Sequence, residues 1–191
     1  MIHYYTNREI SGKLEINLAR WKRWSRSFLP PDPLGGMQSG YARQYIFKDV
    51  IKVYLGGHLL SHWKMGVPES LQVINDLSPW FKRTGYFEIN GSAPKSASAE
   101  FQSRAHRIYF SPARGPGMRN GPAFRYFICR TIQRQSEASQ YGRCVVETYE
   151  ESLINWESPD GSILLQDPEV RMINPSAMVA TVVAKLHRTS R

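Results

Sequence analysis

The chain has 191 residues, of which 41% are hydrophobic and 12% aromatic, enough to build real cores and to exclude global disorder. Lysine and arginine number 25 against 16 aspartate and glutamate, and the net charge of +9 favours a polyanionic partner. The N-terminal residues lack the apolar region of a signal peptide, and no apolar run approaches the roughly 20 residues of a membrane span, so we expect a soluble, cytoplasmic protein without membrane partners.

The first predicted elements are two short helices separated by a tight turn. Thr6 and Glu9 have the spacing of a capping box at the start of the first helix. After a three-residue break, helical spacing resumes over Leu18–Phe28, with Asn17 as its N-cap and a proline run after it. Two short helices joined this closely, the second rich in Arg, Lys and Trp, are typical of a helix-turn-helix.

A glycine-bearing hairpin and further helices are predicted next. Glycines at positions 35, 36 and 40 allow a hairpin tip before an extended segment, Tyr41–Tyr45, and we call residues 35–45 the wing. Helical spacing returns from Phe47 to Trp63, and the Gly56-Gly57 pair within it fits either close packing against the second helix or a kink.

The end of this helical region is marked by proline and by small residues. A further helix opens with Pro68 in its first turn. Pro79-Trp80-Phe81, and then a small, polar run over residues 90–99, mark the end of the domain.

The C-terminal half has a strand-like pattern. Aromatic and β-branched residues are enriched in three segments, His106–Phe110, Phe124–Ile132 and Arg143–Ile154, which predict a small antiparallel sheet. Asn174 and Pro175 are suited to start a final helix over residues 176–187, whose apolar face fits a dimer seam or packing on its own sheet.

Neither cysteine belongs to a recognisable motif. Cys129 and Cys144 lack C-x-x-C spacing, so we expect no zinc or redox site. If the last two predicted strands form a hairpin centred near residues 138–139, Cys129 faces Thr148 and Cys144 faces Gln133, which predicts no disulfide.

These elements predict an α+β fold in two domains. Residues 1–88 form a mainly helical, winged helix-turn-helix domain, residues 89–100 a linker, and residues 101–191 a small antiparallel-sheet domain with a C-terminal helix. The role of the second domain is unassigned, and dimerisation, effector binding and partner binding are its candidate roles.

The N-terminal elements also match the order of a known family motif. Lys22-Arg23-Trp24 stand where that motif has Arg-Tyr-Tyr, Leu29-Pro30-Pro31 follow, and Gly40-Tyr41-x-Arg43-x-Tyr45 supply the wing signature. Over these residues the chain resembles the MerR family of bacterial transcription regulators. The resemblance implies binding of double-stranded DNA near a promoter. The chain departs from the family where a linker and a sheet stand in place of a long dimerising helix.

The proposed DNA contacts come from the second helix, the wing and the start of the first helix. Asn17 and Arg20 are predicted to read base edges, while Lys22, Arg23 and Arg26 contact phosphates. On the wing, Arg43 is expected beside the minor groove and Tyr41 on the sugar-phosphate backbone. Backbone amides at Thr6 and Asn7 can add a phosphate contact. Residues 1–87 hold 12 basic and 6 acidic side chains, which favours this half as the nucleic-acid face.

Other constellations give weaker signals. His58 and His62 have the spacing of two metal ligands on a helix, but no third ligand is near, and ordinary core or surface histidines are favoured. The glycine-rich loop over residues 111–122 fits a hairpin loop better than a phosphate cradle. Nothing pairs a nucleophile with a base, so we expect no enzyme and no cofactor.

The sequence therefore predicts a DNA-binding transcription regulator that acts as a homodimer on an inverted repeat. One alternative is a phage or mobile-element accessory protein that bends DNA, similar to an excisionase. The other is a protein-interaction adaptor with weak nucleic-acid binding.

Overall fold

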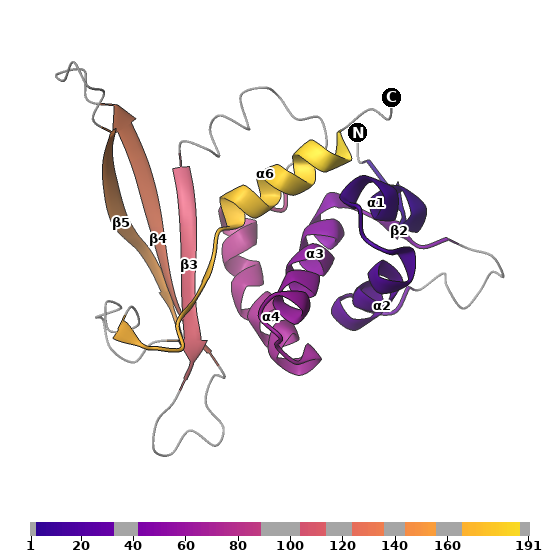
Figure 1. Ribbon diagram of the computed structural model, residues 1–191, viewed down its shortest axis with the longest axis horizontal. Helices are drawn as coiled ribbons and strands as arrows, with labels where there is room; N and C mark the ends of the chain where they lie inside the picture. Colours follow the sequence, from indigo (N-terminus) through magenta and orange to yellow (C-terminus); the bar gives the residue numbers. More distant parts are fainter. Residues whose placement is uncertain are drawn as a thin grey trace. The chain divides into compact units, whose positions relative to one another are not determined.

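The computed structural model describes residues 3–32, 42–88, 104–113, 124–135, 144–155 and 166–187 (Figure 1). The chain forms two compact units: unit 1 comprises Met1–Ala93 with Thr181–Arg191, and unit 2 comprises Pro94–Ala180. The described residues contain five helices and two antiparallel sheets, so the predicted α+β class is confirmed. The predicted linker, residues 89–100, lies outside the described residues.

Helices α1 (Asn7–Leu14) and α2 (Leu18–Phe28) begin at the predicted caps. The backbone N–H of Glu9 donates to Thr6 Oγ1 at 3.3 Å, and the backbone N–H of Thr6 donates to Glu9 Oε2 at 3.1 Å. This reciprocal pair is the expected capping box. Glu15, with a φ of 58°, takes the left-handed conformation that turns the chain between the two helices.

A two-stranded antiparallel sheet joins the start of the chain to the end of the wing. Its strands are β1 (Tyr5–Thr6) and β2 (Gln44–Tyr45), and Tyr5 pairs with Tyr45. The sequence does not predict β1, because a two-residue strand directly before a helix has no periodicity to detect. Tyr41 and the wing tip lie outside the described residues.

Helices α3 (Phe47–Ser61) and α4 (Val67–Arg83) complete the core of unit 1, and α3 packs against both α2 and α4 (Figure 1). Helix α4 continues through Pro79, so the interpretation of Pro79 as a mark of the domain's end is wrong. The next two residues, Trp80 and Phe81, are each 1% exposed. Burial of two large aromatic side chains offsets the roughly 3 kcal/mol that an interior proline costs a helix.

The end of the chain belongs to unit 1. The last residues of α6 (Pro175–Leu186) lie in this unit, although the sequence-based division placed them with the sheet. Lys13 Nζ donates to the backbone carbonyl of Leu186 at 2.6 Å, and Lys185 Nζ lies 2.5 Å from Glu15 Oε2. The final turn of α6 is thus tied to α1 and to the turn that follows it.

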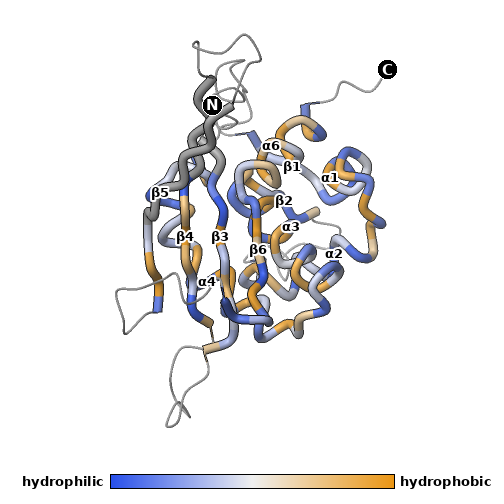
Figure 2. The backbone as a smooth tube through the Cα atoms, turned by 60° about the vertical axis from the view of Figure 1, so that its left-hand side comes forward, coloured by the Kyte–Doolittle hydropathy of each residue, from blue (hydrophilic) through white to orange (hydrophobic). Residues whose placement is uncertain are grey.

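Unit 2 contains a four-stranded antiparallel sheet in the order β5-β4-β3-β6 (Figure 2). Three long strands confirm the predicted ones, and a short fourth strand was not predicted: β3 (Arg104–Pro112), β4 (Phe124–Gln135), β5 (Cys144–Ile154) and β6 (Arg171–Ile173). Ile108 and Phe110 of β3 are buried and pair with the buried Ile128 and Tyr126 of β4. Phe127 and Cys129 are buried as well, so β4 buries side chains on both of its faces. The described part of the chain has no helix that is both long and apolar enough to span a membrane.

Over Cys129–Gln135, the pairing of β4 with β5 differs from the predicted register by two residues. Cys129 pairs with Glu150 and Cys144 pairs with Gln135, so the predicted partners are wrong. Between Ile128 and Cys129 a β-bulge shifts the register by one further residue, and an alternation pattern does not report such an irregularity. The cysteines stand on rungs six residues apart along β4, too far for a disulfide.

The start of α6 is anchored in unit 2, and its N-cap is the predicted one. The backbone N–H of Ala177 donates to Asn174 Oδ1 at 2.9 Å, which confirms the cap. The backbone N–H of His106 on β3 donates to Ser176 Oγ at 3.1 Å, and Val179 is 1% exposed.

Candidate nucleic-acid interface

Helix α2 has one buried face and one cationic face. Trp21, Ser25 and Phe28 are 0%, 2% and 5% exposed, respectively, and their spacing puts them on one side of the helix. The other side carries four exposed cations and no acidic residue, namely Arg20, Lys22, Arg23 and Arg26. The structure therefore brings together all four cations that the sequence singled out on this helix.

The start of α2 uses Asn17 as a cap. Asn17 Oδ1 accepts hydrogen bonds from the backbone N–H groups of Ala19 at 3.0 Å and Arg20 at 3.2 Å. The side chain is exposed, and its NH2 group is the part that can still donate to an acceptor. A base contact by Asn17 would therefore be made by a donor whose position the cap fixes.

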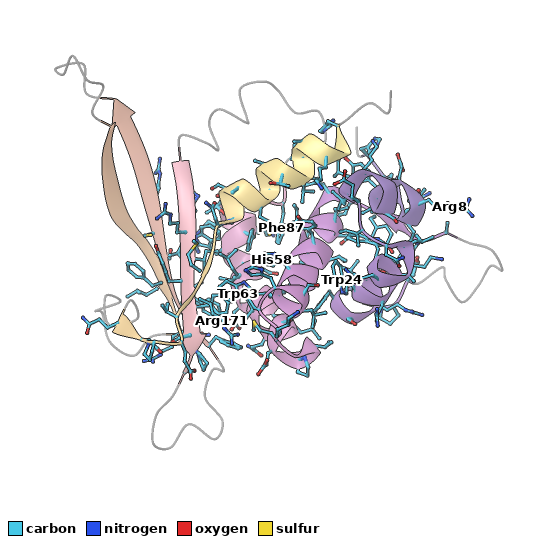
Figure 3. The ribbon with its side chains drawn as sticks, in the orientation of Figure 1. Arg8, Trp24, His58, Trp63, Phe87 and Arg171 are labelled. Atoms are coloured by element: carbon cyan, nitrogen blue, oxygen red, sulfur yellow. The ribbon has the colours of Figure 1, made fainter. Side chains whose placement is uncertain are left out.

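Close packing on α3 sets the position of α2. A Cβ atom on Gly56 would lie 2.5 Å from Phe28 Cδ2, and one on Gly57 would overlap the indole ring of Trp24. Trp24 lies between α2 and α3 (Figure 3). Of the two explanations for the glycine pair, close helix packing is therefore the correct one, since α3 runs without interruption through both glycines.

A buried tyrosine links the middle of α2 to the start of α1. Tyr45 is 1% exposed, its hydroxyl donates to Asn7 Oδ1 at 2.7 Å, and it lies 3.1 Å from Ser25 Oγ. Its ring makes an edge contact with Trp21 at 5.7 Å between centroids. Sequence reasoning did not identify Ser25 as a hydrogen-bond partner. The signal that indicates it is a small polar residue on the apolar face of the helix, four positions after Trp21.

Arg43 lies against the fold instead of extending from it. Its Nη2 donates to the backbone carbonyl of Pro30 at 2.8 Å, and its guanidinium lies 5.6 Å from the centroid of the Tyr45 ring. The side chain is partly buried. The predicted contact of Arg43 beside the minor groove would require this side chain to leave both partners.

At the start of α1, side-chain groups that could contact a phosphate already make hydrogen bonds within the protein. The Thr6 hydroxyl serves the capping box, and the Asn7 side-chain oxygen serves Tyr45. The predicted phosphate contact at these two residues depends on backbone amides, which these bonds leave unused at Asn7. Arg8 projects outward from the same turn (Figure 3).

A second cationic cluster in unit 1 was not predicted. The Nζ atoms of Lys48 and Lys52 lie 5.6 and 5.8 Å from the centroid of the Phe87 ring, which stacks on Phe81. Partial burial, and then the charge of Lys48, lower the pKa of Lys52. Such clusters depend on tertiary contact between α3 and the segment after α4, which the sequence pattern does not report.

The histidine pair on α3 forms a stack. The rings of His58 and His62 lie 5.0 Å apart between centroids at an interplanar angle of 14°. Partial burial, and then the neighbouring His62, lower the pKa of His58. Within the part of the chain that the structure describes, no group of three or more His, Cys, Asp or Glu side chains could hold a metal ion.

Neither the models of known protein families nor the curated proteins include a match to this chain. The function is therefore inferred from what α2 presents to solvent and from what holds it in place.

Proposed function

We propose that this protein is a transcription regulator of MerR-like type that binds double-stranded DNA, with α2 in the major groove and the wing on the minor groove or the backbone. The observation that carries the proposal is the face of α2 with four exposed cations and no acidic residue. It lies on the second helix of a helix-turn-helix, where a recognition helix would lie.

The cations have distinct roles in this proposal. Arg20, in the first turn of α2, reads a base edge together with the Asn17 amide, because residues at the start of a recognition helix reach deepest into the groove. Lys22, Arg23 and Arg26, farther along the helix, neutralise phosphates.

The regulator acts as a symmetric dimer. One recognition helix and one wing bury too little surface for specificity at physiological salt, and a dimer on an inverted repeat doubles the contact. Unit 2 is the candidate for dimerisation, effector binding or partner binding, because every DNA contact in this proposal comes from unit 1.

The test is selection from a pool of random duplexes at near-physiological salt, followed by sequencing of the retained DNA. The full chain is compared with a variant that carries Arg20→Gln and Arg23→Gln. The matched control carries Lys64→Gln and Lys82→Gln, which removes the same charge from two exposed positions of unit 1 outside α2.

The expected result is an inverted repeat that the control variant also recovers and the α2 variant loses. A single half-site recovered together with strong bending favours the accessory-protein alternative. Retention of DNA without sequence preference, equally sensitive to salt in all three proteins, favours the adaptor and contradicts the proposal.

A further inference from the structure

An open cavity of about 500 Å³ lies beside the cationic face of α2. Its walls come from the start of α1, from α2 and from the residues around β2, including Asn7, Lys22, Arg26, Arg43 and Tyr45. We call this cavity the α1–α2–β2 pocket.

The charge of the pocket is predominantly positive. Lys22 and Arg26 are one helical turn apart on α2, and Arg43 joins them from the segment before β2. Among the described lining residues, Asp32 is the one acidic side chain. Three cations from two separate segments therefore converge on a space that holds one carboxylate, which is an environment for an anion.

The polar floor of the pocket is fixed. The hydroxyl of Tyr45 is held between Asn7 and Ser25, and the Ser25 hydroxyl donates to the carbonyl of Lys22 at 3.1 Å. The Asn7 amide gives its oxygen to Tyr45, so its NH2 group can be offered to a ligand. A ligand here meets donors that are already in position.

Arg43 lines the pocket, and contacts with its neighbours hold its side chain there. One of its N–H groups donates to the Pro30 carbonyl, and its guanidinium lies over the Tyr45 ring, 5.6 Å from the centroid. An arginine has five N–H donors in a planar fork, so donors are left for the oxygens of a bound anion.

We propose that the α1–α2–β2 pocket binds a phosphate group. Several arginine and lysine donors around one open space suit the three or more oxygens of a phosphate better than a single carboxylate. The volume exceeds one phosphate and accommodates the sugar or other body attached to it. The phosphate comes either from the backbone of DNA bound on α2, which rests on the proposed function, or from a free phosphorylated molecule.

The first arm of the test measures binding of inorganic phosphate and of ribose 5-phosphate to the full chain by NMR at constant ionic strength. The pocket variant carries Arg26→Gln and Arg43→Gln, and the control carries Lys64→Gln and Lys82→Gln. Because Arg43 also holds Pro30, a second pocket variant with Lys22→Gln and Arg26→Gln, both exposed positions, is measured beside it.

The second arm measures the salt dependence of duplex DNA affinity for the same proteins. Each lost phosphate contact lowers the slope of log affinity against log salt by about 0.9. Raising the salt from about 50 to 200 mM should therefore reduce the DNA affinity of a pocket variant that has lost two contacts by a factor about tenfold smaller than it reduces that of the wild type.

Either source of phosphate gives a distinct result. A lower salt slope in both pocket variants, with weak binding of the free phosphates, identifies the DNA backbone. Saturable binding of a free phosphate that both pocket variants lose identifies a small-molecule ligand, and this result stands even if no protein binds DNA and the proposed function fails. The inference is overturned if pocket and control variants have equal slopes and equal affinities for the free phosphates.

Discussion

Replacing Gly56 with alanine tests how tightly α2 is held on α3. The added methyl group would lie 2.5 Å from the ring of Phe28, which is 5% exposed and has little room to move. The control is Gly12→Ala in α1, where an added Cβ meets no atom within 4 Å. Both changes replace a helical glycine, so they share the same gain in helix propensity of up to about 1 kcal/mol.

The difference between the two variants isolates the cost of overpacking. Insertion of a methyl group into a filled interface costs about 1 to 3 kcal/mol, so Gly56→Ala should be less stable than Gly12→Ala by this amount. For a domain of this size each kcal/mol corresponds to roughly 4 to 8 °C in melting temperature. Gly12→Ala itself should be as stable as the wild type or more stable.

The assay is urea unfolding, monitored by tryptophan fluorescence. The slope of the unfolding free energy against urea concentration is compared between variants to check two-state behaviour. Combining Gly56→Ala with Phe28→Leu should recover at least about 0.5 kcal/mol relative to the sum of the single changes, because the smaller side chain makes room for the methyl group. Equal stability of the Gly56 and Gly12 variants, or strict additivity of the double variant, would refute close packing as the reason for the glycine.

Substitutions at three further positions examine other parts of unit 1. Tyr45→Phe leaves Ser25 and Asn7 without their shared partner and should cost about 1 to 2 kcal/mol of unfolding free energy, measured by urea unfolding; a loss below a few tenths would contradict the role of the hydroxyl. Asn17→Ala should lose about 1 kcal/mol of unfolding free energy, because it removes the cap. Asn17→Ser keeps the cap and the stability but loses DNA affinity if the amide contacts a base. Equal DNA affinity of Asn17→Ser and the wild type would exclude that contact. His62→Gln should raise the pKa of His58 toward 6.5 in an NMR titration, because it removes the neighbouring imidazole. A histidine pKa that is lowered in the folded state makes the free energy of unfolding decrease as pH falls, so the variant should lose less stability on acidification than the wild type. An unchanged His58 titration would contradict this.

Local signals in the sequence predicted the first two helices well. The signals were the caps at Thr6 and Asn17 and the periodicity of residues 18–28, all of which depend on residues close together in sequence. The structure has both helices at those positions. Arg20 and Arg23 could be assigned to one face of α2, with Lys22 and Arg26 flanking them, for the same reason, since helical geometry fixes directions from spacing alone.

Contacts between distant segments could not be predicted in this way. The pairing of Tyr5 with Tyr45, and the hydrogen bonds from Tyr45 to Asn7 and Ser25, join residues 20 to 40 positions apart. Local periodicity contains no information about such pairs. Arg43 shows the consequence for the site: its position against Pro30 depends on how the wing returns to the helices, so a motif that places it on the wing does not say where its guanidinium lies.

The attachments of α2 have a consequence for how variants should behave. Exposed arginine and lysine side chains retain much rotamer freedom, so in the proposed complex the backbone of α2 would set which part of a groove they reach. That backbone is fixed at its start by the Asn17 cap, in its middle by Tyr45, and at its end by Phe28 and Trp24 on the α3 glycines. A change at an attachment displaces all cations together and should weaken binding to every DNA sequence. A change at Arg20 alone removes one reader and should alter which sequences are selected. In the duplex selection, variants of the attachments at Tyr45 and at the α3 glycines should therefore keep the recovered motif with a lower yield. The Arg20 variant, and an Asn17 variant that lacks the amide, should change the motif itself.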